Sequence, residues 1–587
     1  MFHSIKKTLL TAFILSIAFF LSGCGTASKE NANAAFENLS NTLISTALSE
    51  NALDLHFCIS DPSQYGIGES PLSLGHISAD AFRREQALYN QMLVSFSEIN
   101  RSALSEENAY LYDIICSYLK NHSAILDFTY KYEPLSSYSG EHVQLPLMLS
   151  EYTFSTEQDI KDYFSLCELL PEYLNELAEY EKEKAAAGGF MSESAYKSLI
   201  DFCTHFATKN VSEHFLAVSF QKRLNKLDLE DDLKNAYNNK NETMLKETLF
   251  PAYANLSAAI SQIAEENEFH NSGLCSLPSG RKYFELLVRD QTGDARSILE
   301  IGAEMAENIN ALSDDLAASL TENMQLWEII LTGDLNHTLN SEEAFAASKQ
   351  YLSVLSALTE DSFGTAKCDY TVNFIEPALS EYFSSAFFLI PPVDDQESPG
   401  IYINPDTQFS PFDLFTTLAH EGFPGHLLQN NTQKNNIIPR LFSCLGYCEG
   451  WATYSELFSY PIAVEELQLS GDNDPADVAE ILKTYRKLTL CLYALLDYNI
   501  NYNYWTADDA AILLSSYGIS NPETIQEIYN YIVSEPANYM TYYIGYVNIE
   551  KLKEKYMAKG HTEDEFHKAF LSCIEAPFDI VEAKLLQ

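Results

Sequence analysis

The chain has 587 residues, of which 46% are hydrophobic, and its formal net charge is −47. So large a negative charge excludes binding to nucleic acid phosphates through clustered Lys and Arg, and it disfavours contact with an anionic bilayer surface. The length is sufficient for a sizeable core, so the composition predicts a folded protein with an acidic, hydrated surface.

The amino terminus has the order of features found in a secretory signal. Two lysines precede an apolar run at residues 9–21, which is too short to span a membrane comfortably, and small residues follow up to Cys24. Residues 21–24 read Leu-Ser-Gly-Cys and resemble the bacterial lipobox, which implies removal of residues 1–23 and a lipid on Cys24. An uncleaved anchor helix is the alternative. Either arrangement attaches the chain to the cell membrane with its bulk on the extracytoplasmic side.

A helical period follows a short polar tether at residues 24–35. From residue 36 to about residue 270, apolar side chains recur at intervals of three and four, which predicts an amino-terminal helical lobe. The rest of the chain, residues 271–587, is expected to form a second lobe. No later apolar run reaches bilayer length without a charge or a breaker, so no second membrane segment is expected.

Ten cysteines besides Cys24 are scattered without the spacing of a disulfide framework. We therefore expect mostly buried free thiols, and one or two disulfides are the alternative. Cys444 and Cys448 are spaced as neighbours on one helical face, which is compatible with metal binding but more typical of core packing.

The stretch at residues 388–409 contains four prolines and is not a continuous helix. Its β-branched patch predicts a short strand at residues 401–403, bordering the cleft before the next helix. Peptidase sites often bind a substrate backbone along such a strand edge. An ordinary surface connection is the alternative.

Residues 410–429, SPFDLFTTLAHEGFPGHLLQ, contain the chemistry-bearing motif. A helix is expected to begin at Ser410 or Pro411 and to run to His420. Two neutral imidazoles, those of His420 and His426, can bind zinc, and the neighbouring Glu421 carboxylate can take a proton from an activated water. This is the chemistry of the His-Glu-x-x-His helix, but here the second histidine lies six residues after the first.

The spacing of six requires a break in the helix. Residues four apart on a helix differ by about 40° in direction, whereas residues six apart differ by about 120°, so the two histidines would not converge. Pro424 removes one helical hydrogen bond, and Gly422 and Gly425 permit unusual dihedral angles. We therefore predict a break at residues 423–425 that returns His426 to the metal. The alternative is that one histidine binds metal and the other is structural.

A third zinc ligand is sought in residues 446–456, GYCEGWATYSE. Glu449 and Glu456 are seven residues apart and share one face of a helix. Glu449 is predicted to bind the metal, and Glu456 to orient a histidine ring from behind. The alternative is that both are solvated helix acids.

Several segments together resemble a known family. HEGFPGHLLQ, CEGWATYSE and EPANYMTYYIGYVNIEKLKEK, with weaker matches at residues 273–293, 375–383 and 391–405, resemble the domain-of-unknown-function family 885. It is a bacterial family of candidate lipoproteins related to zinc metallopeptidases. The resemblance covers most of the chain after about residue 270. It implies a predominantly α-helical, two-lobed metallopeptidase-like fold with a deep cleft, a small β element and a catalytic second lobe.

The resemblance also implies the roles of single residues. His420, His426 and Glu449 would bind one zinc ion, and Glu421 would be the general base. Tyr542 would donate a hydrogen bond to the developing oxyanion, with Tyr543 as the alternative donor. The remaining assignment is Arg486, which is expected to pair with a substrate carboxylate or, alternatively, to form a structural ion pair.

One departure from the family pattern concerns the substrate pocket. Where the family is expected to have Asp-x-Gly-x-His before Trp-Thr, this chain has Asp497 to Asn501 before Trp505 and Thr506. Asn501 can donate a hydrogen bond near the oxyanion but not a proton, which puts the rate or specificity in doubt.

The sequence thus predicts zinc-dependent hydrolysis of short peptides outside the cytoplasm. One alternative is a peptide- or solute-binding lipoprotein whose metal site is not catalytic. A second is a zinc hydrolase of non-peptide amides or cell-wall fragments. Glu421 beside His420 favours catalysis, because a binding site needs no base at that position.

Overall fold

The structure is a computed structural model that describes residues 29–68, 72–322, 337–364, 369–377, 380, 383–395, 399–471 and 473–587. The signal segment and Cys24 lie outside the described residues. Across these ranges, no helix is both long and apolar enough to cross a membrane.

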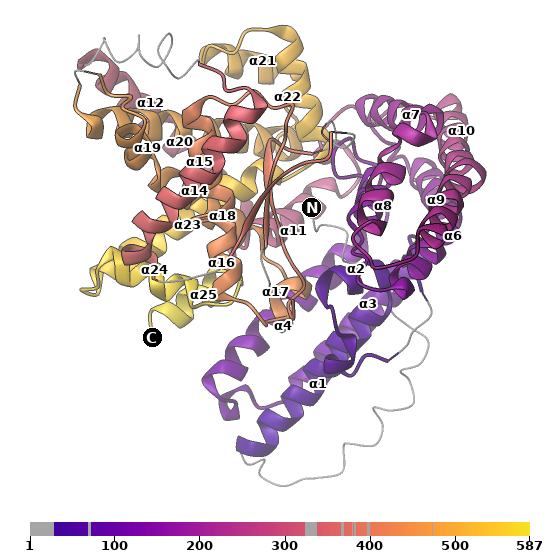
Figure 1. The fold of residues 1–587 in the computed structure, drawn as a ribbon. Coiled ribbons are helices and arrows are strands. Elements are labelled where there is room, and N and C mark those ends of the chain that lie inside the picture. The colour runs from indigo at the N-terminus through magenta and orange to yellow at the C-terminus, as the bar shows by residue number, and fades with distance from the viewer. Residues whose placement is uncertain are drawn as a thin grey trace. The chain divides into compact units, whose positions relative to one another are not determined.

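The described chain is predominantly α-helical with one small three-stranded sheet, which confirms the expected fold class (Figure 1). It divides into two compact units. The amino-terminal unit contains the chain up to Leu286 together with Tyr504–Glu535, and the carboxy-terminal unit contains Leu287–Asn503 and Pro536–Gln587. The boundary falls inside helix α11 (Gly280–Thr292).

The amino-terminal unit is built from helices whose apolar faces follow the helical period. In α6, Ile160, Tyr163, Phe164 and Cys167 are buried in this period, and a Thr156 capping box begins the helix. The helices are α1 (Lys29–Ser49), α2 (Ala52–Cys58), α3 (Ala79–Ser97), α4 (Glu106–Ile125), α5 (Glu141–Glu151), α6 (Glu157–Ala186), α7 (Glu193–Thr208), α8 (Phe215–Leu224), α9 (Asp231–Met244), α10 (Phe250–Glu266), α21 (Ala507–Ser516) and α22 (Pro522–Ser534).

Residues 504–535 are held to the earlier part of this unit by hydrogen bonds at the end of α22. The Glu535 carboxylate accepts hydrogen bonds from the Ser136 hydroxyl (2.8 Å) and from the Ser139 hydroxyl and amide. Helix α22 also packs against α7. Residues 504–535 are therefore an integral part of the amino-terminal core.

The carboxy-terminal unit contains every residue that the sequence predicted for the metal site and its surroundings. Its central packing is between α18 and α23, with α20 against α12 and α23, and α14 against α15 and α24. The helices are α12 (Ile298–Glu322), α14 (Ser341–Phe363), α15 (Pro411–Glu421), α16 (His426–Thr432), α17 (Ile438–Leu441), α18 (Leu445–Phe458), α19 (Tyr460–Glu466), α20 (Pro475–Tyr502), α23 (Asn538–Ala558), α24 (Glu563–Leu571) and α25 (Phe578–Leu585).

The sheet of this unit corrects one expectation. The predicted strand is present as β3 (Gly400–Ile403), but it lies in the middle of the order β1-β3-β2 rather than at an edge. It is parallel to β1 (Thr371–Phe374) and antiparallel to β2 (Ala386–Leu389). Both of its sides are paired, so an edge for strand addition exists only on β1 or β2.

Candidate metal centre

Helix α15 carries His420 near its carboxyl end and ends one residue later, as the sequence predicts. The Ser410 hydroxyl caps the helix by accepting the Asp413 amide (3.0 Å), and Pro411 occupies the first turn. The helix ends at Glu421, and α16 begins at His426. The predicted break between the two histidines is confirmed.

Two contacts hold this break in place. An added Cβ on Gly425 would lie 1.8 Å from the carbonyl oxygen of His420, so only glycine fits there. The indole Nε1 of Trp451, a fully buried residue of α18, donates a hydrogen bond to the Pro424 carbonyl oxygen (2.8 Å). The break and the helix that carries Glu449 are thus joined directly.

His420, His426 and Glu449 converge on one point. One ligand atom from each of the three lies within 4.8 Å of the others. The Glu449 Oε2 atom is 3.4 Å from His420 Nε2 and 3.6 Å from His426 Nε2. The two imidazole rings are nearly perpendicular, with centroids 4.9 Å apart. The fold therefore brings together all three residues that the sequence nominated as ligands.

Glu456 lies behind the first histidine. Its Oε2 atom is 3.8 Å from His420 Nδ1, on the side of the ring opposite to Glu449. Arg486 fixes this carboxylate with two bonds, from Nε (2.7 Å) and Nη2 (3.1 Å), and the Tyr460 hydroxyl donates a third at 3.3 Å. Arg486 thus forms the internal ion pair that the sequence left open as an alternative, and its pairing with a substrate carboxylate stays a prediction.

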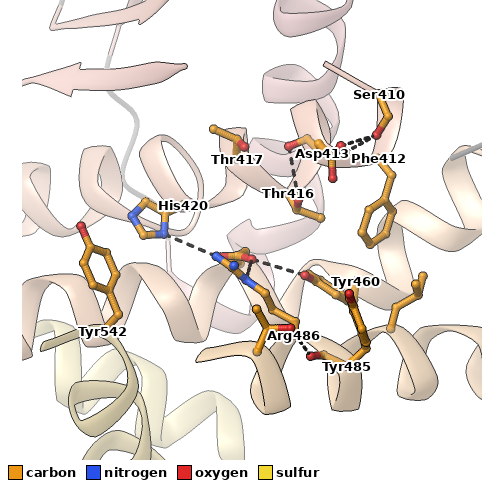
Figure 2. Close-up of a pocket in the computed structure, with 13 residues that line it drawn as sticks. Ser410, Phe412, Asp413, Thr416, Thr417, His420, Tyr460, Tyr485, Arg486 and Tyr542 are labelled. Carbon is orange, nitrogen blue, oxygen red and sulfur yellow. Dashed lines mark hydrogen bonds and ion pairs between the residues drawn. The ribbon is translucent and has the colours of Figure 1, made fainter. Parts of the chain in front are cut away.

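A close approach of two helices positions Glu449 and Tyr542. An added Cβ on Gly450 would lie 2.5 Å from the backbone of Gly545, and one on Gly545 would lie 2.2 Å from the carbonyl oxygen of Gly446. Glycine at all three positions lets α18 and α23 touch backbone to backbone. The Tyr542 ring then lies near the His420 ring, with centroids 6.4 Å apart and an angle of 24° (Figure 2).

The electrostatics of the cluster favour a bound cation. Burial lowers the pKa of His420, but the hydrogen bond with Glu449 and the charges of Glu421, Glu449 and Glu456 raise it to about 9. Burial also raises the pKa of Glu449, but His426 and His420 outweigh this effect and hold it well below the ordinary value. Without a metal, this raised pKa favours a proton on His420, which offsets part of the carboxylate charge.

Glu421 is placed by the sheet. Its Oε2 atom accepts a hydrogen bond from the backbone N–H of Phe388 in β2 (2.8 Å). Strand β2 pairs with β3 on one side only, and the Phe388 amide bonds Glu421 rather than a second neighbouring strand. The sequence did not predict β2, so this partner of Glu421 was missed.

Two other nominated residues lie in the core. Tyr543 is 2% exposed, and burial raises the pKa of its hydroxyl, with Cys491 adding to the effect. Asn501 is fully buried and donates a hydrogen bond to Asp497 Oδ1 (2.9 Å). Neither side chain lines the pocket beside His420, whereas Tyr542 does.

The described cysteines form no disulfide. The nine described cysteines are all free thiols, and seven of them are buried. Cys444 and Cys448 lie at the start of α18, and neither belongs to the metal-ligand group of His420, His426 and Glu449. Core packing is therefore the interpretation that the structure supports for this pair.

The comparisons with known proteins agree with the motifs. The family model described as "Bacterial protein of unknown function (DUF885)" matches residues 63–585. The chain belongs to this family. No curated protein matches it.

Solved structures share the fold of this DUF885 protein. The crystal structure of a candidate lipoprotein from Colwellia psychrerythraea matches with a TM-score of 0.80 and 17% identity, over 95% of this chain and 98% of that chain. The structure of a candidate lipoprotein of unknown function from Shewanella oneidensis matches with a TM-score of 0.62 and 14% identity, over 96% and 100%. Metallocarboxypeptidase 1 of Trypanosoma cruzi aligns with a TM-score of only 0.30 and 12% identity, too low to indicate a common fold.

The donor set of this DUF885 protein fits zinc. Catalytic zinc is commonly bound by three protein groups drawn from imidazole nitrogens and a carboxylate, and a fourth position stays open. His420, His426 and Glu449 supply two nitrogens and one oxygen within 4.8 Å of one another. A second carboxylate behind a ligating imidazole, as Glu456 lies behind His420, is the usual outer support of such a site.

Proposed function

We propose that this protein is a zinc-dependent hydrolase that cleaves peptide bonds in short peptides. The observation that carries the proposal is the convergence of His420, His426 and Glu449, with Glu421 directly beside the first ligand. A site that only stores or transports a metal has no need of a base at this position.

The chemistry divides between the metal and the side chains around it. Zinc, when bound, lowers the pKa of a water toward about 7 and polarises a carbonyl group. Glu421 takes a proton from the attacking water and passes it to the leaving amine. The Phe388 amide, which donates to Glu421 Oε2, holds this carboxylate in place.

Three further side chains support the reaction. The Tyr542 hydroxyl donates a hydrogen bond to the oxyanion that develops on the substrate carbonyl, because its ring lies beside His420. Glu456 and Arg486 hold the orientation of the His420 ring.

We also propose that the protein works outside the cytoplasm, anchored by a lipid on Cys24. The sequence around Cys24 supports this placement, as does the fold shared with two candidate lipoproteins. Mass spectrometry of Cys24 from the native membrane tests it, and an unmodified, uncleaved amino terminus would contradict it.

Metal analysis and peptide cleavage test the hydrolase proposal together. We expect the purified protein to hold about one zinc ion per chain, as the three-ligand set requires, and to cleave a quenched peptide library. His426→Ala and Glu449→Ala should lose both zinc and activity, whereas His561→Ala, an exposed histidine, should lose neither. Glu421→Gln should keep zinc and lose turnover by about 10²-fold or more.

Other results would overturn the proposal. Zinc retained in both ligand variants would make the ligand assignment wrong. Full turnover in the Glu421→Gln variant would show that Glu421 is not the general base. Zinc bound stoichiometrically, without cleavage of any peptide, would favour a binding lipoprotein with a non-catalytic metal site.

A further inference from the structure

A pocket of about 600 Å³ opens beside His420, bounded by α15, α18, α19, α20 and α23. We call it the α15 pocket, because one face of that helix forms its wall (Figure 2). Asp413, Thr416, Thr417 and His420 all line it, at the spacing of three and four that places residues on one helix face.

The wall has a metal end and an acidic end. Asp413 lies seven residues before His420 on α15, which corresponds to about 10 Å along the helix axis. Thr416 and Thr417 lie between them (Figure 2). The chemistry at His420 is thus about two helical turns from the Asp413 carboxylate.

The charges that line the pocket do not cancel. Glu456 and Arg486 neutralise each other through their two-point ion pair. Asp413 accepts a hydrogen bond from the Ser410 hydroxyl (2.7 Å), and its charge acts on Arg486, but among the described residues it forms no ion pair within 4.0 Å. Its side chain is exposed and lines the pocket. The end of the pocket away from His420 therefore has a net negative charge.

The pocket also has apolar surface that suits the stem of a long side chain. Tyr460 of α19 and Leu482 and Tyr485 of α20 line it with aromatic and apolar surface, together with Phe412 of α15. The methylene groups of Lys and Arg pack well on such surfaces while the charged head reaches beyond them, and aromatic faces attract the cation itself. From Cα to its charged group, an extended Lys or Arg side chain spans roughly 6–7 Å by standard bond lengths. With an ion-pair distance of about 3 Å added, this reach covers roughly the 10 Å that separates His420 from Asp413 along α15.

We propose that the α15 pocket binds a lysine or arginine side chain of the substrate, next to the scissile bond, and that Asp413 determines this specificity by pairing with its charge. The inference rests on the proposed hydrolase function, because that function places the scissile bond at His420. It names the substrate class as basic peptides.

Asp413 also has a structural role that the test must separate from binding. It is the third residue of α15, where an acid favours the helix terminus. Asp477 is a matched control, because it too is the third residue of a helix, α20, with proline at the first position and no ion pair among the described residues. Asp413→Asn keeps an acceptor for Ser410 and removes only the charge.

The test uses peptides that differ in one residue, which is Lys, norleucine or Glu, placed on either side of the scissile bond. With zinc-loaded wild type, we expect kcat/KM for the Lys peptide to exceed that for norleucine by about tenfold or more. Asp413→Asn should remove this preference, and Asp413→Lys should favour the Glu peptide. Asp477→Asn should behave as wild type, and equal melting temperatures would exclude a folding defect.

A binding measurement separates this proposal from the hydrolase proposal. Fluorescence anisotropy of the same labelled peptides with the zinc-loaded Glu421→Gln protein measures peptide binding in the absence of turnover. Lys-selective binding that is lost in Glu421→Gln/Asp413→Asn supports the pocket even if the wild type cleaves nothing. Equal binding of the Lys and norleucine peptides, or selectivity unchanged by Asp413→Asn, overturns it even if the wild type cleaves every peptide.

Discussion

At the level of single residues, the Glu456 carboxylate connects Arg486 and Tyr460 to the back of the His420 ring. Glu456→Gln removes the charge beside His420 Nδ1, so the ring becomes less basic and less firmly oriented. We expect zinc affinity to fall by about 10–100-fold, measured by competition with a chelator. Glu465→Gln, an exposed position on α19, is the control and should leave the affinity unchanged. Equal zinc affinity in the two variants would show that Glu456 does not support the metal site.

Asp497 gives a second prediction at the residue scale. Burial raises the pKa of this carboxyl to about 7, against the opposing hydrogen bonds from Ala537 and Asn501. The folded protein therefore holds a proton that the unfolded chain loses near pH 4, so stability falls as pH rises from about 4 to about 7, by up to about 4 kcal/mol. Asp497→Asn should flatten this fall in urea unfolding between pH 5 and pH 7.5. Parallel pH profiles for the two proteins would contradict the raised pKa.

The sequence was sufficient to nominate the three clustered residues but not their partners. The spacing of His420 and His426 around Pro424, together with a carboxylate followed by Gly-Trp, pointed to residues that do converge. The donor to Glu421 is a backbone amide of Phe388, and backbone groups leave no mark in a sequence. Tyr542 and Tyr543 are adjacent aromatic residues, and only the packing of α23 shows which of them lines the pocket.

At the level of elements, the contact of α18 with α23 sets the position of Glu449. The contact depends on Gly446 and Gly450, four residues apart on one helix face, against Gly545. Gly450→Ala must push the helices apart, since the added methyl group meets backbone rather than a movable side chain. We expect a loss of about 1–3 kcal/mol in stability and weaker zinc binding. Gly68→Ala is the control, because an added methyl group meets nothing within 4 Å there.

A second prediction for the elements concerns the tie between α18 and the break after α15. Trp451→Phe keeps most of the buried ring but leaves the Pro424 carbonyl without its indole donor. We expect a cost of about 1–3 kcal/mol in denaturant unfolding, and a lower zinc affinity because the position of His426 depends on this break. Unchanged stability would show that another group satisfies the carbonyl.

Helices were easier to predict than strands because of their length. The three strands have four residues each, too few for an alternating pattern to stand out. Ile401 and Ile403 marked β3, but nothing in residues 371–374 or 386–389 showed that two partners would cover both of its sides. The helix break was predictable because proline and glycine act locally.

At the level of the whole molecule, the clustered ligands belong to one unit only. His420, His426 and Glu449 all lie in the carboxy-terminal unit. A ligand that binds only the folded state stabilises it by about 2.7 kcal/mol at one hundred times its dissociation constant. Zinc should therefore slow hydrogen exchange in α15, α16 and α18, as measured by comparing the protein with and without the metal. Slowing of α6 and α10 to the same degree would show that the two units unfold together.

The division into units exceeds what periodicity can predict. Apolar spacing shows which face of a helix is buried but not which helix covers it, so α21 and α22 carried no sign that they join the amino-terminal unit. The predicted boundary near residue 270 also assumed two consecutive lobes, whereas the chain passes between the units three times.

This interleaving of the chain constrains how the protein is made. The chain is synthesised from its amino terminus, yet the amino-terminal unit needs Tyr504–Glu535, and the carboxy-terminal unit needs residues that follow them. Neither core can be completed until most of the chain has been synthesised, so the apolar faces of the early helices stay exposed until then. No truncation near residue 270 or 287 therefore leaves either unit with its full set of helices.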